Sequence, residues 1–414
     1  ASPTAVVNCT GLRLCGNAAG TGPVNQATVT QTLWDNNTVP SVSANENVWE
    51  FSGEVGVPIL KDLPLVQSFN ADLAGRYTNY SISGSVETWK IGLDWHVNDD
   101  IRFRGTTSVD IRAPTLNDLF SPQVSNSGPF LDPLTNFNPG GIQTVSGGNP
   151  NLVPESSRTY TGGIVLTPTW IPGLTVSADY YQIKLKNAIT SISGSNPAIA
   201  NLCIASGGTS PFCKLYVRPF PYTNTTPANY PTLLYSQSLN AAFNVTEGED
   251  YEIDYGFDMA DVSDLAGVVN LRALLNVAPV NTTSSFPGAP VNYTTQPKGH
   301  ATIFGDYTLG NWTVDAQWHW FSGGSNVAVF GPGQTYYAQP RFGSFSTMDF
   351  TLARRIDLGD GSAMSAYFNV QNAFDAVPPY TVGSSGNPGS IFGGIPQGED
   401  VMGRYFTIGI RGAL

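Results

Sequence analysis

The side chains best suited by type and spacing to bind a charged group lie at alternate positions of one short segment. Arg102, Arg104, Asp110 and Arg112 share one phase of a two-residue repeat. The other phase is apolar or small and consists of Ile101, Phe103, Gly105, Thr107, Val109 and Ile111. A period of two places these sets on opposite faces of a β-strand. Three guanidinium groups and a carboxylate on one face suit anion binding, and they equally suit a solvated surface whose charges pair with their neighbours.

All three histidines also fall on polar phases, and two of them suggest a metal pair. If Leu309-Gly310 forms a two-residue hairpin loop, His300 lies directly opposite His319. The Cβ atoms of opposed residues are about 5 Å apart, close enough for two imidazoles to share a metal. The alternative is that both histidines bind water or a neighbouring domain, because the sequence shows no third ligand.

The four cysteines fall into two close pairs, Cys9 with Cys15 and Cys203 with Cys213. Neither spacing resembles a zinc knuckle, and no histidine lies near either pair. We therefore expect two local disulfides in an oxidising compartment. Free, buried thiols are the alternative.

Two polar segments that we expect to be loops contain clustered aromatic residues. These residues are Phe220, Tyr222, Tyr230 and Tyr235 in one segment, and Phe330, Tyr336 and Tyr337 in the other. Aromatic rings beside glycine and asparagine suit stacking on sugars or aryl groups. They equally suit loops that pack on themselves, so the two interpretations stay open.

The composition excludes several classes of function. Only 12% of the 414 residues are charged, the net charge is −12 and no basic block occurs, so we do not expect nucleic-acid binding. The sequence shows no nucleophile with an ordered base, so we expect neither an enzyme nor a cofactor. No run of about 18 apolar residues occurs, which excludes a transmembrane helix but not a β-barrel.

The alternating pattern recurs along the chain and predicts thirteen strands. Between 312 and 320, tryptophan, valine and alanine alternate with threonine, aspartate, glutamine and histidine without interruption. The 44 glycines and 30 prolines fit a β-rich chain with many turns. The strands are expected at 48–60, 65–80, around 89–97, 101–112, 157–169, 174–189, 249–260, 267–280, 298–308, 311–322, 344–357, 362–373 and 402–413.

The connections between these strands alternate in length. Short turns such as Asp99-Asp100 are followed by long links, and only the link around Ser83-Gly84 breaks the rule. The long links are expected at 114–156, 190–248, 281–297, 323–343 and 374–401. Short turns at one rim and long loops at the other are typical of outer-membrane barrels. The predicted fold is therefore an all-β, antiparallel transmembrane barrel.

Five short segments resemble signatures of a known family. They are 110–120 (DIRAPTLNDLF), 148–155 (GNPNLVPE), 178–183 (ADYYQI), 368–375 (FNVQNAFD) and 403–406 (GRYF). In this order they resemble TonB-dependent receptors of Gram-negative outer membranes. The resemblance extends over nearly all of the chain and covers the second half of the family's architecture. Leu414 departs from it, because the family usually ends in an aromatic residue.

The resemblance implies a location, partners and residue roles. The chain would be a multi-pass barrel of the outer membrane, in contact with lipid. It would be coupled to a TonB-type protein through a plug domain that these residues lack, and a surface lipoprotein is a further partner of such receptors. The four charged residues at 102–112 would line the lumen, where they contact the plug or an anionic substrate, or form a solvated wall.

Thirteen strands do not complete the barrel that this family builds. Barrels of about 22 strands enclose a plugged lumen, so about nine strands would come from elsewhere. Open strand edges would otherwise leave backbone N–H and C=O groups unpaired in lipid. Residues 1–47 are expected as an extracellular loop, 48–414 as the C-terminal part of the barrel, and the first half as a separate polypeptide that carries the plug.

The function that this architecture implies is energy-coupled uptake of a large, scarce substrate. Siderophores, oligosaccharides, haem and vitamin chelates all fit the scaffold. One alternative is a passive, substrate-specific channel, which would lack a plug and a coupling segment. The other is a surface adhesin or phage receptor, whose deletion would leave uptake unchanged.

Overall fold

The computed structural model describes residues 42–289, 291–293, 297–325, 341–359, 362–379 and 402–413. The chain divides into two compact units. The first, here called the sheet unit, comprises residues 47–114, 153–190 and 239–414. The second, the loop unit, comprises residues 115–152 and 191–238 together with the first 46 residues.

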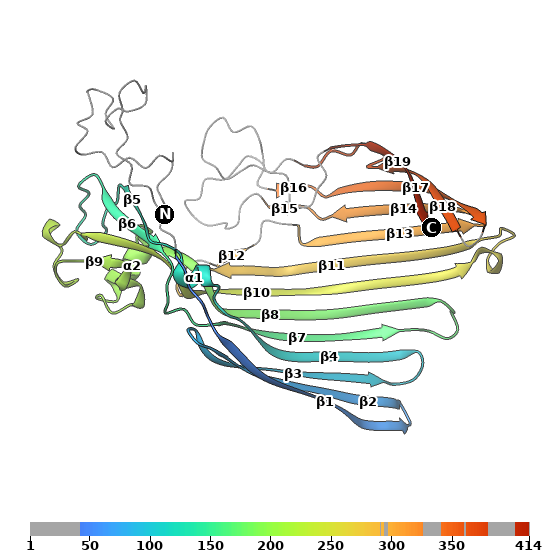
Figure 1. The fold of residues 1–414 in the computed structure, drawn as a ribbon, viewed down its shortest axis with the longest axis horizontal. Coiled ribbons are helices and arrows are strands. Elements are labelled where there is room, and N and C mark those ends of the chain that lie inside the picture. The colour runs from blue at the N-terminus through green and yellow to red at the C-terminus, as the bar shows by residue number, and fades with distance from the viewer. Residues whose placement is uncertain are drawn as a thin grey trace, which may run out of the picture. The chain divides into compact units, whose positions relative to one another are not determined.

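Thirteen strands of nine or more residues lie within the described part of the chain, and each overlaps a predicted strand. They are β1 (Val48–Leu63), β2 (Val66–Tyr80), β3 (Gly84–His96), β4 (Ile101–Arg112), β7 (Glu155–Leu166), β8 (Leu174–Ser193), β10 (Leu233–Asp258), β11 (Val268–Ser284), β13 (Gly299–Leu309), β14 (Trp312–Phe321), β17 (Phe345–Gly359), β18 (Ser362–Gln371) and β19 (Tyr405–Ala413). Each pairs with the next in this order. Figure 1 shows them side by side, from β1 and β2 at one end to β18 and β19 at the other.

The sheet has one polar and one apolar face, as the two-residue period requires. In the first three strands the register places Leu73 opposite both Val55 and Ile91, and Ala74 opposite both Glu54 and Lys90. Among the described residues the side chains of the apolar face are exposed: Leu73 is 44% exposed, Ile303 43% and Leu352 42%. An apolar surface of this extent suits contact with lipid rather than water.

The lengths of the connections alternate as predicted. The turn between β1 and β2 is Pro64-Leu65 and the turn between β13 and β14 is Gly310-Asn311, whereas the link from β4 to β7 runs over 113–154. One predicted loop, 190–248, is too long. Strand β8 continues to Ser193 and β10 begins at Leu233, because Leu233–Gln237 pairs with short strands of the loop unit.

The loop unit is built from short elements around an apolar core. They are α1 (Leu116–Phe120), β5 (Val124–Gly128), β6 (Ile142–Gly147), α2 (Pro197–Ala205) and β9 (Tyr216–Val217). Leu119, Ile199 and Leu234 are at most 1% exposed. Outside this unit lie three two-residue strands, β12 (Asn292–Tyr293), β15 (Gly324–Ser325) and β16 (Arg341–Phe342). Across the described ranges, no helix has the length and apolar character needed to span a membrane.

One of the two predicted disulfides is confirmed. Cys203, which lies in α2, bonds to Cys213 and closes a small ring within the loop unit. Cys203 is fully buried, so the bond is part of the unit's core. Cys9 and Cys15 lie outside the described residues, and their pairing stays a prediction.

Each of the two outermost strands has one neighbour within the described residues. Strand β1 pairs with β2 and strand β19 pairs with β18. Within the ranges that the structure describes, no register joins β1 to β19. Among the described residues, the outer edges of β1 and β19 therefore have no backbone partner, and a further strand could pair with them.

Candidate functional site

The polar face of the sheet carries the charged residues predicted at 102–112, and the structure gives each arginine a carboxylate partner. Arg102 binds Asp94 from the neighbouring strand β3. Arg104 binds Asp179 on β8, with Nε–Oδ1 and Nη2–Oδ2 distances of 2.8 and 2.5 Å. Two parallel N–H donors on one carboxylate form a bidentate, charge-assisted pair. The arginines are therefore fixed in place by their neighbours.

Arg112 joins two of the signature segments. Its Nε and Nη2 donate to the two oxygens of Glu155, at 2.9 and 2.6 Å, and Glu155 also accepts the backbone N–H of Ile189. Arg112 lies in the segment 110–120 and Glu155 in the segment 148–155. The pair thus ties the strand that begins the long β4–β7 link to the strand that ends it.

Within the loop unit the same two segments approach each other closely. The backbone N–H groups of Gly148 and Asn149 donate to the carbonyls of Ser121 and Asp118, at 2.9 and 2.8 Å. A Cβ atom on Gly148 would lie 2.5 Å from the backbone nitrogen of Ser121. Only glycine fits at this distance, which explains that residue of the signature physically.

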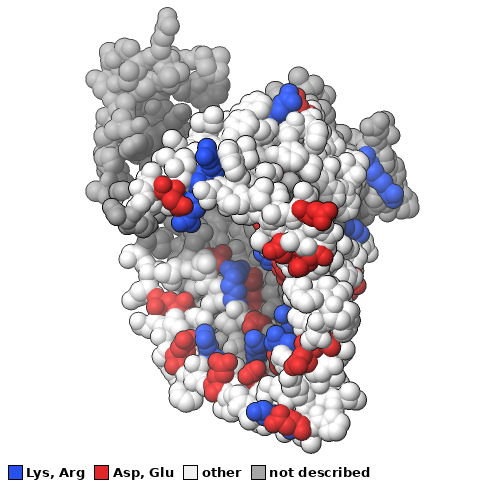
Figure 2. Space-filling view, turned by 90° about the vertical axis from the view of Figure 1, so that its right-hand side faces the viewer, with Lys and Arg blue, Asp and Glu red and all other residues white. Residues whose placement is uncertain are grey.

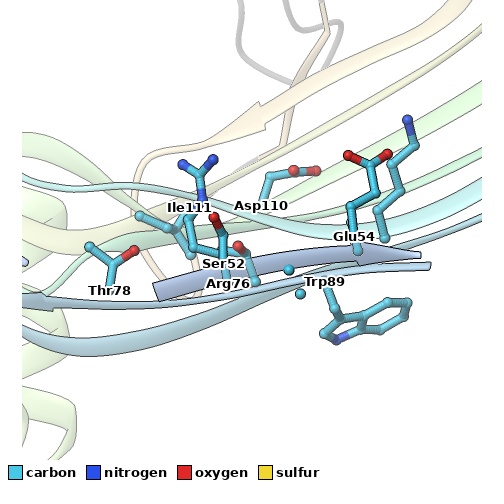
Figure 3. A pocket seen from close by; sticks show the side chains of 12 residues that line it. Ser52, Glu54, Arg76, Thr78, Trp89, Asp110 and Ile111 are labelled. Carbon is cyan, nitrogen blue, oxygen red and sulfur yellow. The ribbon is translucent and has the colours of Figure 1, made fainter. Parts of the chain in front are cut away.

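A cavity of about 450 Å³ opens on the polar face of the first four strands. Its lining includes Glu54, Arg76, Lys90 and Asp110. Figure 3 shows Glu54 and Asp110 projecting from one side of the sheet and the ring of Trp89 from the other. Acidic and basic side chains also gather around the hollow of the space-filling view (Figure 2).

The charges in this cavity are only partly neutralised. Asp110 accepts a hydrogen bond from Ser108 at 2.6 Å, and Arg76 lies 3.6 Å from Glu50. In the described parts of the chain, no ion pair involves Glu54 or Lys90. The cavity can therefore offer both an acceptor and a donor to a polar solute.

The predicted pairing of His300 with His319 is wrong. The hairpin loop is Gly310-Asn311 rather than Leu309-Gly310, so His300 lies opposite Phe321 and His319 opposite Thr302. The His300 ring packs on Phe321 at 4.8 Å, while His319 lies 3.9 Å from Asp349. The structure shows no cluster of three or more metal-binding side chains among the residues it describes.

A buried ion pair that we did not predict lies within the loop unit. Asp132 and Arg218 come from different long links, and their side chains are 0% and 4% exposed. Arg218 donates from Nη1 and Nη2 to the two carboxylate oxygens at 2.8 and 2.7 Å, and Thr135 donates to the same carboxylate. The residues are 86 positions apart, so no local pattern in the sequence could have revealed the pair.

The surroundings of this pair favour the ionised forms. Burial opposes ionisation of Asp132, but the hydrogen bonds from Arg218 and Thr135 outweigh it and hold the pKa of Asp132 below its usual value. The guanidinium also lies 5.1 Å from the ring of Tyr222 and 5.6 Å from that of Tyr216. Burial raises the pKa of both tyrosines, so their rings stay neutral.

The aromatic candidates of the loop unit fall into different environments. Tyr222 packs on Arg218, and Tyr230 donates to the carbonyl of Phe130 at 2.9 Å. Tyr235 lies in β10 opposite Val145 of β6, whereas Phe220 is 47% exposed. Phe330, Tyr336 and Tyr337 lie outside the described residues. Of these candidates, Phe220 presents the most accessible ring within the described part of the chain.

Comparison with known proteins decides the family. A model of the "TonB dependent receptor-like, beta-barrel" domain matches residues 17–373. The chain belongs to the TonB-dependent receptor family. Its location is therefore the Gram-negative outer membrane, and its sheet is part of an antiparallel transmembrane β-barrel.

Individual relatives agree with this assignment. The vitamin B12 transporter BtuB of Vibrio vulnificus is 27% identical over 119 residues, which are 29% of this chain and 15% of that protein. A variant of the ferric enterobactin receptor of Pseudomonas aeruginosa, solved with enterobactin, matches with a TM-score of 0.61 and 14% identity over 89% of this chain and 46% of its own. The siderophore receptor PirA of Acinetobacter baumannii matches with a TM-score of 0.55 and 14% identity, over 80% and 42%.

The chain thus spans less than half of each of these relatives. At this level of identity the two solved structures establish a shared fold. TonB-dependent receptors combine a barrel with a plug domain, and the family match here concerns the barrel.

Proposed function

We propose that this chain forms the C-terminal part of the wall of a TonB-dependent transporter, which takes up a large, scarce substrate through energy coupling. The observation that supports this most strongly is the polar face of the sheet. Its arginines are held by bidentate carboxylate partners, and the opposite face is apolar and exposed. A wall with this arrangement can line a hydrated lumen while the other side contacts lipid.

The partners follow from the same architecture. The open edges of β1 and β19 would pair with further strands, which complete a barrel around a plug domain. The plug would contact the periplasmic energy-coupling protein, and the fixed arginines Arg102, Arg104 and Arg112 would face the plug or the passing substrate. The named relatives bind siderophores or vitamin B12, so we propose a metal chelate of that size as the substrate class.

An uptake assay separates this function from its alternatives. A strain that lacks the gene should no longer accumulate a labelled ferric siderophore or cobalamin. In the wild type, dissipating the proton-motive force should also abolish this accumulation. A passive channel would keep equilibrating the substrate without the proton-motive force. An adhesin would show no uptake defect for any of the probes.

A pair of variants on one strand tests the role of the wall. Lys90→Gln removes a cation from the cavity on the polar face, and uptake should fall in rate while the amount of assembled protein stays constant. Ile91→Val changes the neighbouring residue on the apolar face and is the matched control, with unchanged uptake expected. Equal effects of the two variants would contradict a specific role of the polar face.

A further inference from the structure

Three cations gather on the apolar face of the sheet unit, at the end of the strands from which the long links leave. Arg158 on β7 lies directly opposite Lys184 on β8, and Lys186 follows two residues further along the same face. All three side chains are exposed. We call these three residues the basic cluster.

The register fixes the face on which the basic cluster lies. Trp89 pairs with Val109, and Val109 pairs with Arg158, so all three project from the apolar face. The guanidinium of Arg158 lies 5.1 Å from the centroid of the Trp89 ring and 5.2 Å from that of Tyr160. The two rings hold the cation on this face by cation–π contacts.

The three cations of the basic cluster form no ion pair within the part of the chain that the structure describes. There, no ion pair joins a carboxylate to Arg158, Lys184 or Lys186, although each arginine at 102, 104 and 112 has one. A nearby carboxylate, Glu247, instead accepts a hydrogen bond from Gln182 at 2.7 Å. Like charges directly opposite each other repel, so an external anion between Arg158 and Lys184 would relieve that repulsion.

We propose that the basic cluster binds the phosphate groups of a phosphorylated lipid headgroup in the outer leaflet of the outer membrane. In barrels of this kind the long loops are extracellular, and aromatic residues mark the membrane interface. The cluster lies just beyond Tyr160 and Tyr180 on the loop side, which is the level of the headgroups. A charged side chain on the lipid-facing surface costs least at this level.

The chemistry of the cluster matches a phosphate well. The guanidinium offers a planar pair of N–H donors, and the two ammonium groups offer point charges on long, flexible stems. A phosphate between them would replace the repulsion between Arg158 and Lys184 with charge-assisted hydrogen bonds. This inference depends on the location of the barrel in the membrane and not on the transported substrate.

Binding of purified lipid A to the complete, detergent-solubilised protein tests the inference. We would titrate diphosphorylated lipid A and its enzymatically dephosphorylated form, and measure bound lipid by native mass spectrometry. The wild type should prefer the phosphorylated form. Each charge removed in Arg158→Gln and in Lys184→Gln/Lys186→Gln should weaken its binding about fivefold, with no change for the dephosphorylated form.

Arg354→Gln is the matched control. Arg354 also lies on the apolar face with its guanidinium over a tryptophan ring, 5.0 Å from the centroid of Trp312, but it is at the opposite, short-turn end of the strands. Its loss should leave binding of diphosphorylated lipid A unchanged. Three results would each overturn the proposal: unchanged affinity in the cluster variants, an equal loss with dephosphorylated lipid A, or an equal loss in Arg354→Gln.

Discussion

At the scale of single residues, the ion pairs of the two units differ in how deeply they are buried. On the polar face of the sheet, arginines and carboxylates pair in half-exposed positions such as Arg104 with Asp179. In the loop unit, Asp132 and Arg218 pair in almost complete burial. A buried pair is costly to break, because the remaining charge stays desolvated without a partner. The loop unit therefore depends on this pair more than the sheet depends on any one of its own.

Removing the charge of Asp132 should destabilise the loop unit. We expect Asp132→Asn to lower its free energy of unfolding by about 3–5 kcal/mol, because Arg218 would then be a buried, unpaired cation. The double variant Asp132→Leu/Arg218→Met should be less destabilised than the single one. Pulse proteolysis of the full protein in urea, with cleavage mapped to 115–152 and 191–238, measures this. A double variant that is less stable than Asp132→Asn would contradict the argument.

The same carboxylate should make the loop unit sensitive to acid. The pKa of Asp132 in the folded state lies below its value in the unfolded state, which is about 3.9. The unfolded state therefore takes up the proton first, so this stabilisation is complete above about pH 4 and is lost as pH falls through the lower, folded pKa. Proteolysis with pepsin across this range should show the loss in the wild type and not in Asp132→Asn. The same pH profile in both proteins would exclude Asp132 as the titrating group.

At the scale of the elements, each strand presents two surfaces to two solvents. Neighbouring residues of one strand therefore differ in how well they tolerate a charged substitution, even where their exposed fractions are similar. The turns between strands add a second constraint, because a two-residue link demands particular backbone angles. Both effects can be tested on β2 and the turn that precedes it.

Adjacent arginine substitutions in β2 should have different costs. Leu73 lies on the apolar face opposite Ile91, and Leu73→Arg should cost about 2–4 kcal/mol if that face meets the middle of the membrane. Ala74 lies on the polar face between Glu54 and Lys90, where water can solvate an added charge, so Ala74→Arg should cost far less. Heat-modifiable migration on gels measures the assembled fraction. If Ala74→Arg fails first, our assignment of the faces is reversed.

The first hairpin contains backbone strain that substitution should relieve. Leu65 occupies the second position of the Pro64-Leu65 turn with φ 62°, a left-handed conformation that costs an L-residue about 1–2 kcal/mol. We expect Leu65→Gly and Leu65→Asn to stabilise the protein by up to about 1 kcal/mol, since both residues tolerate this conformation. Leu65→Ala keeps the strain while removing the exposed side chain, so it should give no gain. Urea unfolding of the three variants measures these changes in stability. If Leu65→Ala also stabilised the protein, the cause would be the exposed leucine side chain and not the backbone strain.

At the scale of the whole molecule, the described sheet has two unpaired edges. In a membrane such edges are costly, because lipid offers no hydrogen-bond partners to the backbone. The family places this sheet in a barrel, and we propose that strands beyond this chain complete it. The consequence is that only in the complete protein should both edges of β1 be hydrogen-bonded.

Hydrogen exchange tests whether β1 gains a second neighbour. In the complete protein, the backbone amides of Val48–Leu63 that point away from β2 should exchange slowly, since a further strand binds them. In this chain alone, the same amides should exchange quickly, while those that face β2 keep their protection. The amides of the central strand β13 are the internal control and should be slow in both samples. Fast exchange along that edge of β1 in the complete protein would contradict pairing at this edge.

The sequence by itself determined the features that depend on local periodicity. Alternation identified the thirteen long strands and their two faces, the lengths of the links identified the two rims, and a separation of ten residues was enough to pair Cys203 with Cys213. Only the tertiary structure decided which residues meet across the sheet. A hairpin loop shifted by one residue moved the partner of His300 from His319 to Phe321, because pairing is set by the turn and not by the pattern within each strand. Likewise, no local signal could join Arg104 to Asp179 or Asp132 to Arg218, since their positions are brought together by pairings between distant segments.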